Sequence, residues 1–120
     1  MKYMLLIYHN PAGFEALSEE ERNAVMGDVD TIVNELTQSG ELIGGEGLAD
    51  PSNTKTVKVR DGVPAITDGP YLEAKEHLVG YCLLECESGE RAIDIATRWP
   101  DARYWAVEVR PLMHQAGTEM

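Results

Sequence analysis

Residues 2–9 form a short apolar and aromatic run in which both strand faces are apolar. Alternate side chains of an extended strand point to opposite faces. One face carries Tyr3, Leu5, Ile7 and His9, and the other carries Met4, Leu6 and Tyr8. The turn-forming residues 10–13 end the run. The pattern predicts a central strand that must be covered on both sides.

A long helix is predicted over residues 18–39. Ser18 and Glu21 have the spacing of a capping box, and the intervening glutamates lie where the helix dipole favours negative charge. Gly40 stands where a helix stop belongs. Apolar side chains recur at helical spacing and are expected in the core: Met26, Val29, Ile32 or Val33, and Leu36.

Five further strands and a second helix are predicted. The helix starts at Ser88 and is stopped by Pro100. Three glycines at 44, 45 and 47 indicate a bulge, or a place where another backbone or a ligand comes close. Asp61-Gly62 is a tight-turn pair that joins two of the strands in a hairpin. The expected strands cover residues 41–48, 54–60, 63–67, 78–86 and 104–110.

This order of elements predicts an α+β, ferredoxin-like domain, with an antiparallel sheet and both helices on one face. The 120 residues are enough for one domain, over residues 1–112, followed by a polar tail over 113–120. Two helices cover only one sheet face, yet several strands are apolar on both. We therefore expect a homodimer that forms through the open sheet face.

The chain is strongly acidic, with 21 acidic and 10 basic residues and a formal charge of −11. This charge repels nucleic acid and anionic lipid surfaces, so neither is an expected partner. The sequence contains no signal peptide and no apolar stretch of about 20 residues, which predicts a cytoplasmic protein. No phosphate-binding glycine loop, nucleophile elbow or metal-spaced cluster is present, so no cofactor or metal is expected.

The two cysteines, Cys82 and Cys86, lie four residues apart within a predicted strand. Strand geometry separates them by about 13 Å, which is too far for a disulfide bond. Buried, reduced thiols are therefore expected.

Several motifs together resemble the DGPF-domain branch of the YCII-related proteins. They include the turn Thr67-Asp68-Gly69-Pro70-Tyr71, the segment Glu73-Ala74-Lys75-Glu76, and the pairs Gly45-Glu46 and Gly80-Tyr81. The first strand and the segment from Val107 to Pro111 also match, so the resemblance covers about residues 1–112. It implies a dimeric α/β barrel with two sheets facing each other around a cleft. It also implies a bacterial protein without an assigned reaction, associated in the genome with extracytoplasmic-function sigma factors.

The sequence departs from the family pattern in two places. The turn motif ends in Tyr71 where the family name implies Phe, which adds a hydroxyl able to hydrogen-bond. The broader group is suspected of enzymatic activity because of a His and Asp pair, with the His in the first helix. Residues 18–39 contain no His, so that acid–base role is not carried over.

The candidate cleft residues are ionisable or aromatic side chains near predicted strand ends and turns. His9 and His77 could line a cleft mouth, where their near-neutral pKa suits proton transfer. Glu46 lies between glycines, and Asp68 belongs to the stiff Gly-Pro turn. For each of these residues a structural role is an equal or stronger alternative. The full set is His9, Glu46, Asp68, Tyr71, Lys75, His77, Tyr81, Glu108 and Arg110.

Two functions fit these residues. The first is a barrel that binds a small molecule, including the case of a cofactor-independent enzyme with a polar cleft. The second is a non-catalytic accessory or sensor protein that acts through protein contacts in a sigma factor pathway. The sequence by itself assigns no catalytic residue.

Overall fold

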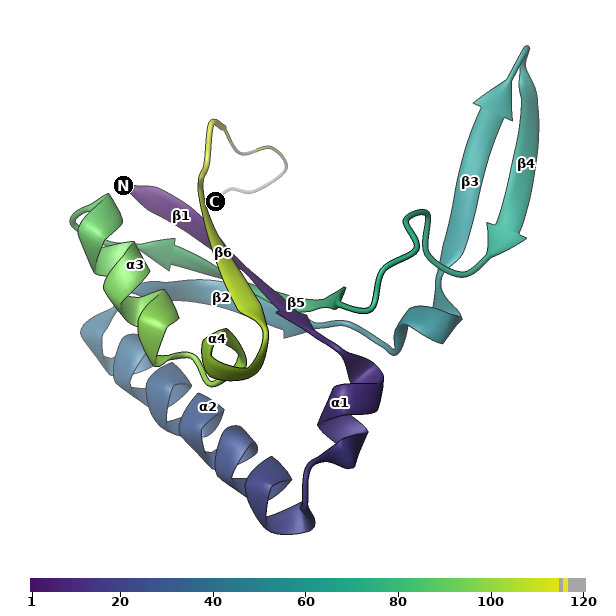
Figure 1. Cartoon of the computed structure of the whole chain (residues 1–120). Helices are drawn as coiled ribbons and strands as arrows, with labels where there is room; N and C mark the ends of the chain where they lie inside the picture. The colour runs from purple at the N-terminus through teal and green to yellow at the C-terminus, as the bar shows by residue number, and fades with distance from the viewer. Residues whose placement is uncertain (115, 117–120) are drawn as a thin grey trace.

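The computed structural model describes residues 1–114 and 116, and it has an α+β fold (Figure 1). The elements follow one another as β1 Lys2–His9, α1 Pro11–Ala16, α2 Glu19–Ser39, β2 Leu42–Gly47, the 3-10 turn η1 Pro51–Asn53, β3 Lys55–Arg60, β4 Val63–Asp68, β5 His77–Glu85, α3 Gly89–Arg98, α4 Asp101–Tyr104 and β6 Ala106–Pro111. Most of the tail expected over 113–120 lies outside the described residues.

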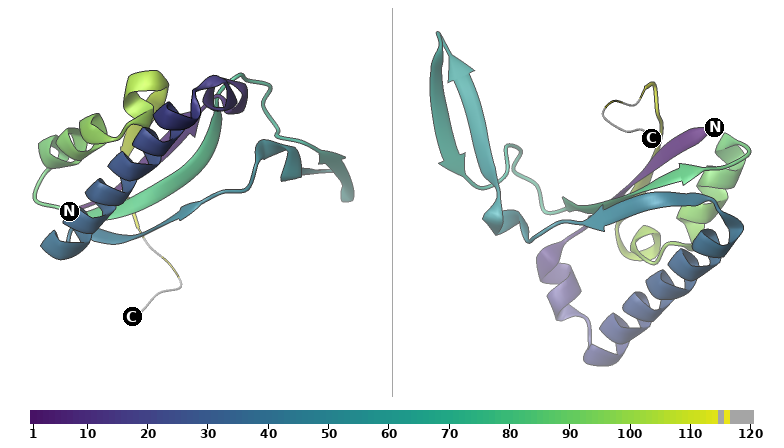
Figure 2. Two further views of the ribbon diagram at one scale, coloured as in Figure 1. Left: turned by 90° about the horizontal axis from the view of Figure 1, so that it is seen from below. Right: turned by 180° about the vertical axis from the view of Figure 1, so that it is seen from behind.

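The main sheet is antiparallel and has the strand order β2-β5-β1-β6. β1 is hydrogen-bonded on both sides, which confirms the predicted central strand. The helices lie on one side of this sheet (Figure 2). Among the described residues, none of the helices has the length and apolar character needed to cross a membrane.

The core lies between this sheet and the helices α2 and α3. Leu5 and Leu84 from the sheet, Leu36 from α2 and Ile95 from α3 are fully buried. On the opposite, open face of β1, the side chains Met4, Leu6 and Tyr8 are only half-buried. The sheet therefore has one face covered by helices and one face that remains partly apolar and open.

Helix α2 is capped as predicted. Ser18 Oγ accepts a hydrogen bond from the Glu21 backbone at 3.0 Å, and the Glu21 carboxylate accepts one from the Ser18 backbone at 3.0 Å. Gly40 ends the helix in the left-handed conformation, with φ of 79°. The expected core position of Met26 is wrong, because its neighbour Val25 is buried while Met26 is 55% exposed.

Two short helices, α1 and α4, stand where the sequence pattern predicts a turn and the start of a strand. The expected turn at residues 10–13 is the start of α1, because the Asn10 side chain accepts hydrogen bonds from the next two free backbone N–H groups and Pro11 fits the first helical position. The expected strand over 104–110 begins only at Ala106. Tyr104 instead closes α4, which follows Pro100 directly.

An ion pair joins α3 to the start of β2. Arg91 donates to both carboxylate oxygens of Glu41, at 2.8 and 2.9 Å. These hydrogen bonds lower the pKa of Glu41 to about 2, although partial burial acts in the opposite direction. A bidentate arrangement of this kind fixes the orientation of both groups.

Both cysteines are free and buried, which confirms the expected reduced thiols. Burial raises the pKa of Cys82 to about 11, so this thiol is neutral at pH 7.

β3 and β4 form a separate hairpin that extends away from the main sheet (Figure 1). This hairpin over residues 55–68 is called the arm below. Asp61 and Gly62, both with positive φ, form its tip, as the sequence predicts.

The glycines of β2 mark both a bulge and a close approach of two backbones. The pairing of β2 with β5 shifts register between Leu42 and Gly44. A Cβ atom on Gly45 would lie 2.6 Å from the Tyr81 carbonyl oxygen, and one on Gly80 would lie 2.9 Å from the Glu46 carbonyl oxygen. A Cβ atom on Gly47 would have no such heavy atom within 4 Å.

Gly45→Ala should therefore weaken the sheet, whereas Gly47→Ala should not. The new Cβ at position 45 forces the paired strands apart, and we expect a loss of about 1–3 kcal/mol of unfolding free energy. Gly47→Ala is the matched control and should change stability by less than about 1 kcal/mol. Urea unfolding measures both variants, and equal stability of the two would contradict the close approach.

Candidate functional site

A cavity of about 350 Å³ lies between the covered face of the sheet and the helices α1 and α2. Its wall is mostly apolar and includes Phe14 from α1, Val29 from α2 and Trp99 after α3. The close-packed glycine segments of β2 and β5 also border it. The ionisable residues of the lining are His9, Glu46, Tyr81, Cys82 and Asp101. Strand alternation turns the side chains of Glu46 and Tyr81 to the other face of the sheet, which leaves His9 and Asp101 as the ionisable pair on the cavity side.

His9 and Asp101 form a pair, with Nδ1 of the imidazole 3.4 Å from Oδ2 of the carboxylate. His9 is at the end of β1, on the same face as the core residues Leu5 and Ile7. Asp101 opens α4 and is 6% exposed, which makes it a buried charged residue. Strand β1 and the sharp Trp99-Pro100 connection thus bring together residues that are far apart in the sequence.

Two aromatic rings hold the imidazole in place. The ring of Phe14 stacks on His9 at 5.2 Å with an interplanar angle of 8°, and the ring of Trp105 lies 5.3 Å away in a tilted arrangement. The side chain of His9 remains 22% exposed. Its ring is therefore fixed in orientation and still accessible from the cavity.

The electrostatics of the pair are set by burial and by mutual attraction. Burial raises the pKa of the Asp101 carboxyl, while the charge of His9 and its hydrogen bond act in the opposite direction. A carboxylate at Nδ1 orients the imidazole and leaves Nε2 for a molecule in the cavity. This arrangement can accept a proton from a bound molecule and return it.

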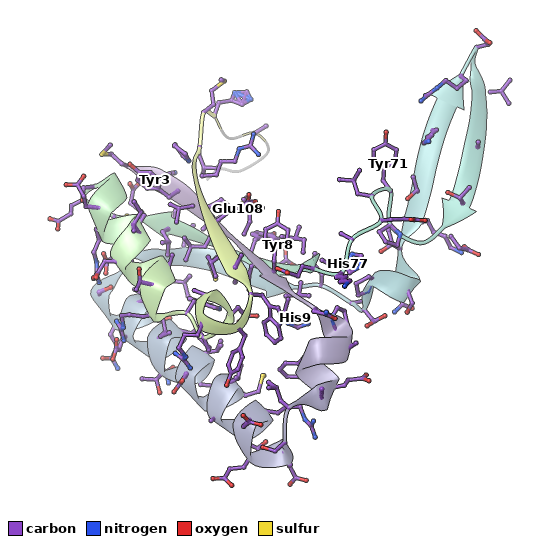
Figure 3. All side chains as sticks on the ribbon, viewed as in Figure 1. Tyr3, Tyr8, His9, Tyr71, His77 and Glu108 are labelled. Atoms are coloured by element: carbon purple, nitrogen blue, oxygen red, sulfur yellow. The ribbon has the colours of Figure 1, made fainter. Side chains whose placement is uncertain are left out.

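A second polar group lies on the open face of the sheet. Tyr81 donates a hydrogen bond to Glu46 at 2.6 Å, and Tyr8 donates one to Glu108 at 2.8 Å. These hydrogen bonds raise the pKa of both phenols, so both are neutral at pH 7. Figure 3 shows Tyr8 and Glu108 on the side of the sheet away from the helices, whereas His9 lies next to α1.

The structure separates the sequence-predicted candidates and does not bring them into one site. His9 is in the cavity, and His77 faces it across the strand ladder as its partner in the β1–β5 register. The open face holds Glu46, Tyr81, Glu108 and Arg110. Asp68 forms an ion pair with Lys55 of the arm, and the ring of Tyr71 lies 5.0 Å from the Lys58 ammonium. Lys75 is exposed in the loop before β5.

Sequence reasoning missed Asp101, Phe14 and Trp105. A signal for α4 was present, because an acidic residue directly after Pro is typical of a first helical turn. No signal in the sequence, however, brought that carboxylate next to His9. The chain does contain a His and Asp pair, although its His belongs to β1 and not to α2.

A metal site has no support in the side-chain geometry. Within the part of the chain that the structure describes, no cluster of three or more His, Cys, Asp or Glu side chains could hold a metal ion. In the cavity, the His9–Asp101 pair is arranged for proton transfer, whereas the Cys82 thiol, whose pKa is raised to about 11 by burial, is neutral at pH 7.

Exchanging Glu46 for Gln should lower the pKa of Tyr81 towards its ordinary value of 10.0. An amide still accepts the hydrogen bond of the phenol, but it does not oppose the negative charge of the phenolate. Glu108→Gln is the matched variant and should act on Tyr8 alone. NMR titration of the tyrosine ring carbons measures both, and an unchanged titration in Glu46→Gln would contradict the pairing.

The whole chain is similar to known proteins. The sequence model of the YCII-related domain family matches residues 1–115. An uncharacterized protein of Rhizobium meliloti (strain 1021) is 32% identical over 114 residues, which cover 93% of this chain and 92% of that protein.

Proposed function

The chain belongs to the YCII-related domain family, and from its cavity we propose a cofactor-independent enzyme that transfers protons on a small, mostly apolar substrate. The observation that carries this proposal is the pair of half-buried His9 and buried Asp101 in the wall of a mostly apolar cavity. Motif residues 68–71 support a place in the DGPF-domain branch of the family.

In this proposal His9 is the general acid–base residue, and Asp101 is the positioning residue. Asp101 holds the imidazole through Nδ1, so that Nε2 can remove a proton from the substrate and deliver it to another position. Phe14 and Trp105 restrict rotation of the ring. The 22% exposure of the His9 side chain lets the proton that it carries exchange with solvent. The substrate has an apolar body next to a group that acidifies a C–H or O–H bond, such as a carbonyl.

Deuterium exchange tests this proposal without knowledge of the physiological substrate. The protein is incubated in D₂O with a panel of small aliphatic and aromatic ketones and keto acids, and NMR follows deuterium uptake next to the carbonyl. We expect catalysed exchange for some members of the panel. His9→Gln should reduce it about 100-fold or more, because general acid–base catalysis contributes at least this much.

His77→Gln is the matched control, because His77 is the neighbour of His9 in the strand ladder but does not line the cavity. It should leave exchange unchanged, whereas Asp101→Asn should lower the rate of exchange more than it weakens binding of the compound. Equal exchange in His9→Gln and wild type would reject the enzyme. If no compound exchanges or raises the melting temperature, the accessory-protein alternative is favoured.

We also propose that the chain forms a ferredoxin-like homodimer, in which two open sheet faces meet as a dimeric α/β barrel. The strand order β2-β5-β1-β6, with helices on one face, supports this arrangement. The half-buried apolar side chains of the open face support it further, since they gain burial only from a second layer. Residues Met4, Leu6, Tyr8, Tyr81 and Leu83 make up this apolar surface.

Light scattering tests the dimer directly. The chain has a mass of 13.3 kDa, and we expect a particle of twice that mass at micromolar concentration. Leu6→Glu should shift the particle to the monomer mass, because it places a charge in the centre of the proposed interface. A wild-type particle of 13.3 kDa would reject the dimer.

A further inference from the structure

The two faces of the arm differ in what contacts them. Strand alternation and the β3–β4 register place Lys58 and Val63 on one face, which is called the braced face because the turn after β4 contacts it. The opposite face is called the bare face. Tyr71 folds back onto the braced face below Lys58, and the Thr56 hydroxyl donates to the Gly69 carbonyl at 2.7 Å. The bare face carries Val57, Val59, Pro64 and Ile66, with the Lys55–Asp68 ion pair at its base.

The bare face is apolar and exposed to an unusual degree for a hairpin. Val57 is 60% exposed and Ile66 is 67% exposed, and every residue of β4 is exposed. A hairpin of only two strands is at most marginally stable in water unless a third layer covers it. The fold of this chain provides that cover for the main sheet but not for the arm.

The arm rises on the side of the open sheet face, opposite the helices (Figure 1 and the right view of Figure 2). Its six-residue strands span about 20 Å, while two stacked sheets lie only about 10 Å apart. A protein layer packed on the open face would therefore have the arm along its side. The arm is long enough to extend beyond that layer.

The charge of the arm permits contact between two acidic copies of this chain. The arm carries Lys55, Lys58 and Arg60 against Asp61 and Asp68, a net charge of +1, which leaves −12 for the rest of the chain. Lys58 and Arg60 lie on the braced face, and Lys55 is paired with Asp68, so the bare face has no net charge. An apolar face without net charge can pack against the acidic body of a second copy without adding to the repulsion between the two copies.

We propose that the arm clasps a second copy of this chain, with the bare face of Val57, Val59, Pro64 and Ile66 against the flank of the partner. The proposal rests on the homodimer proposed above and adds a separate contact to it. Two-fold symmetry makes the contact reciprocal, so each copy holds the other with its own arm.

Sedimentation velocity over a concentration series tests the clasp. Ile66→Ser, on the bare face, should raise the dimer dissociation constant about tenfold or more, because each dimer loses two apolar contacts. Val57→Ser should act in the same direction. Val63→Ser is the matched control, since Val63 is 65% exposed in the same hairpin but on the braced face, and it should leave the constant unchanged within about twofold.

A photo-crosslinker supplies a direct readout of proximity. With p-benzoylphenylalanine at position 66, illumination should give a covalent dimer, and with the same group at position 63 it should give much less. A wild-type dimer whose dissociation constant is equal in Ile66→Ser and Val63→Ser would overturn the clasp and leave the sheet-mediated dimer intact. A wild-type monomer at roughly 100 μM would overturn both proposals.

Discussion

The structure depends on the central position of β1. This strand is hydrogen-bonded to β5 on one side and to β6 on the other, and its core-facing residue Leu5 is fully buried. Its side chains point alternately to the two faces of the sheet, as in any strand. Because the strand is central, these side chains lie in the middle of both faces. One face receives the helices and the cavity, and the other receives the tyrosine–glutamate pairs. The same strand ends in His9, so the geometry of the cavity follows from the register of the sheet.

Much of this fold could be predicted from the sequence, because strong local signals mark its main elements. The capping box of Ser18 and Glu21 and the stop at Gly40 determine α2 almost to the residue. The short helices were harder to predict, because an Asn-Pro pair is typical of both a turn and a helix start. In α1 the hydrogen bonds of the Asn10 side chain decide between the two.

The candidate site could be predicted only in part. His9 was identified from its place at a strand end, but its partner Asp101 is fixed by packing between distant elements, and local patterns do not contain that information. The glycines around Glu46 favour a cleft carboxylate, and the sequence places Glu108 on one strand face with Arg110. Strand alternation puts both carboxylates on the open face, where a tyrosine hydroxyl donates to each of them. The turn at Asp68 is part of the arm, where the carboxylate pairs with Lys55.

The pairing of His9 with His77 in the strand ladder places the imidazole of the cavity next to the point where the chain re-enters the main sheet. His77 is the first residue of β5, and the loop over residues 69–76 separates it from Asp68 at the base of the arm. Residues 70–76 of this loop are exposed. The arm and the imidazole are therefore joined through an exposed loop and one rung of the sheet, and not through the rung alone.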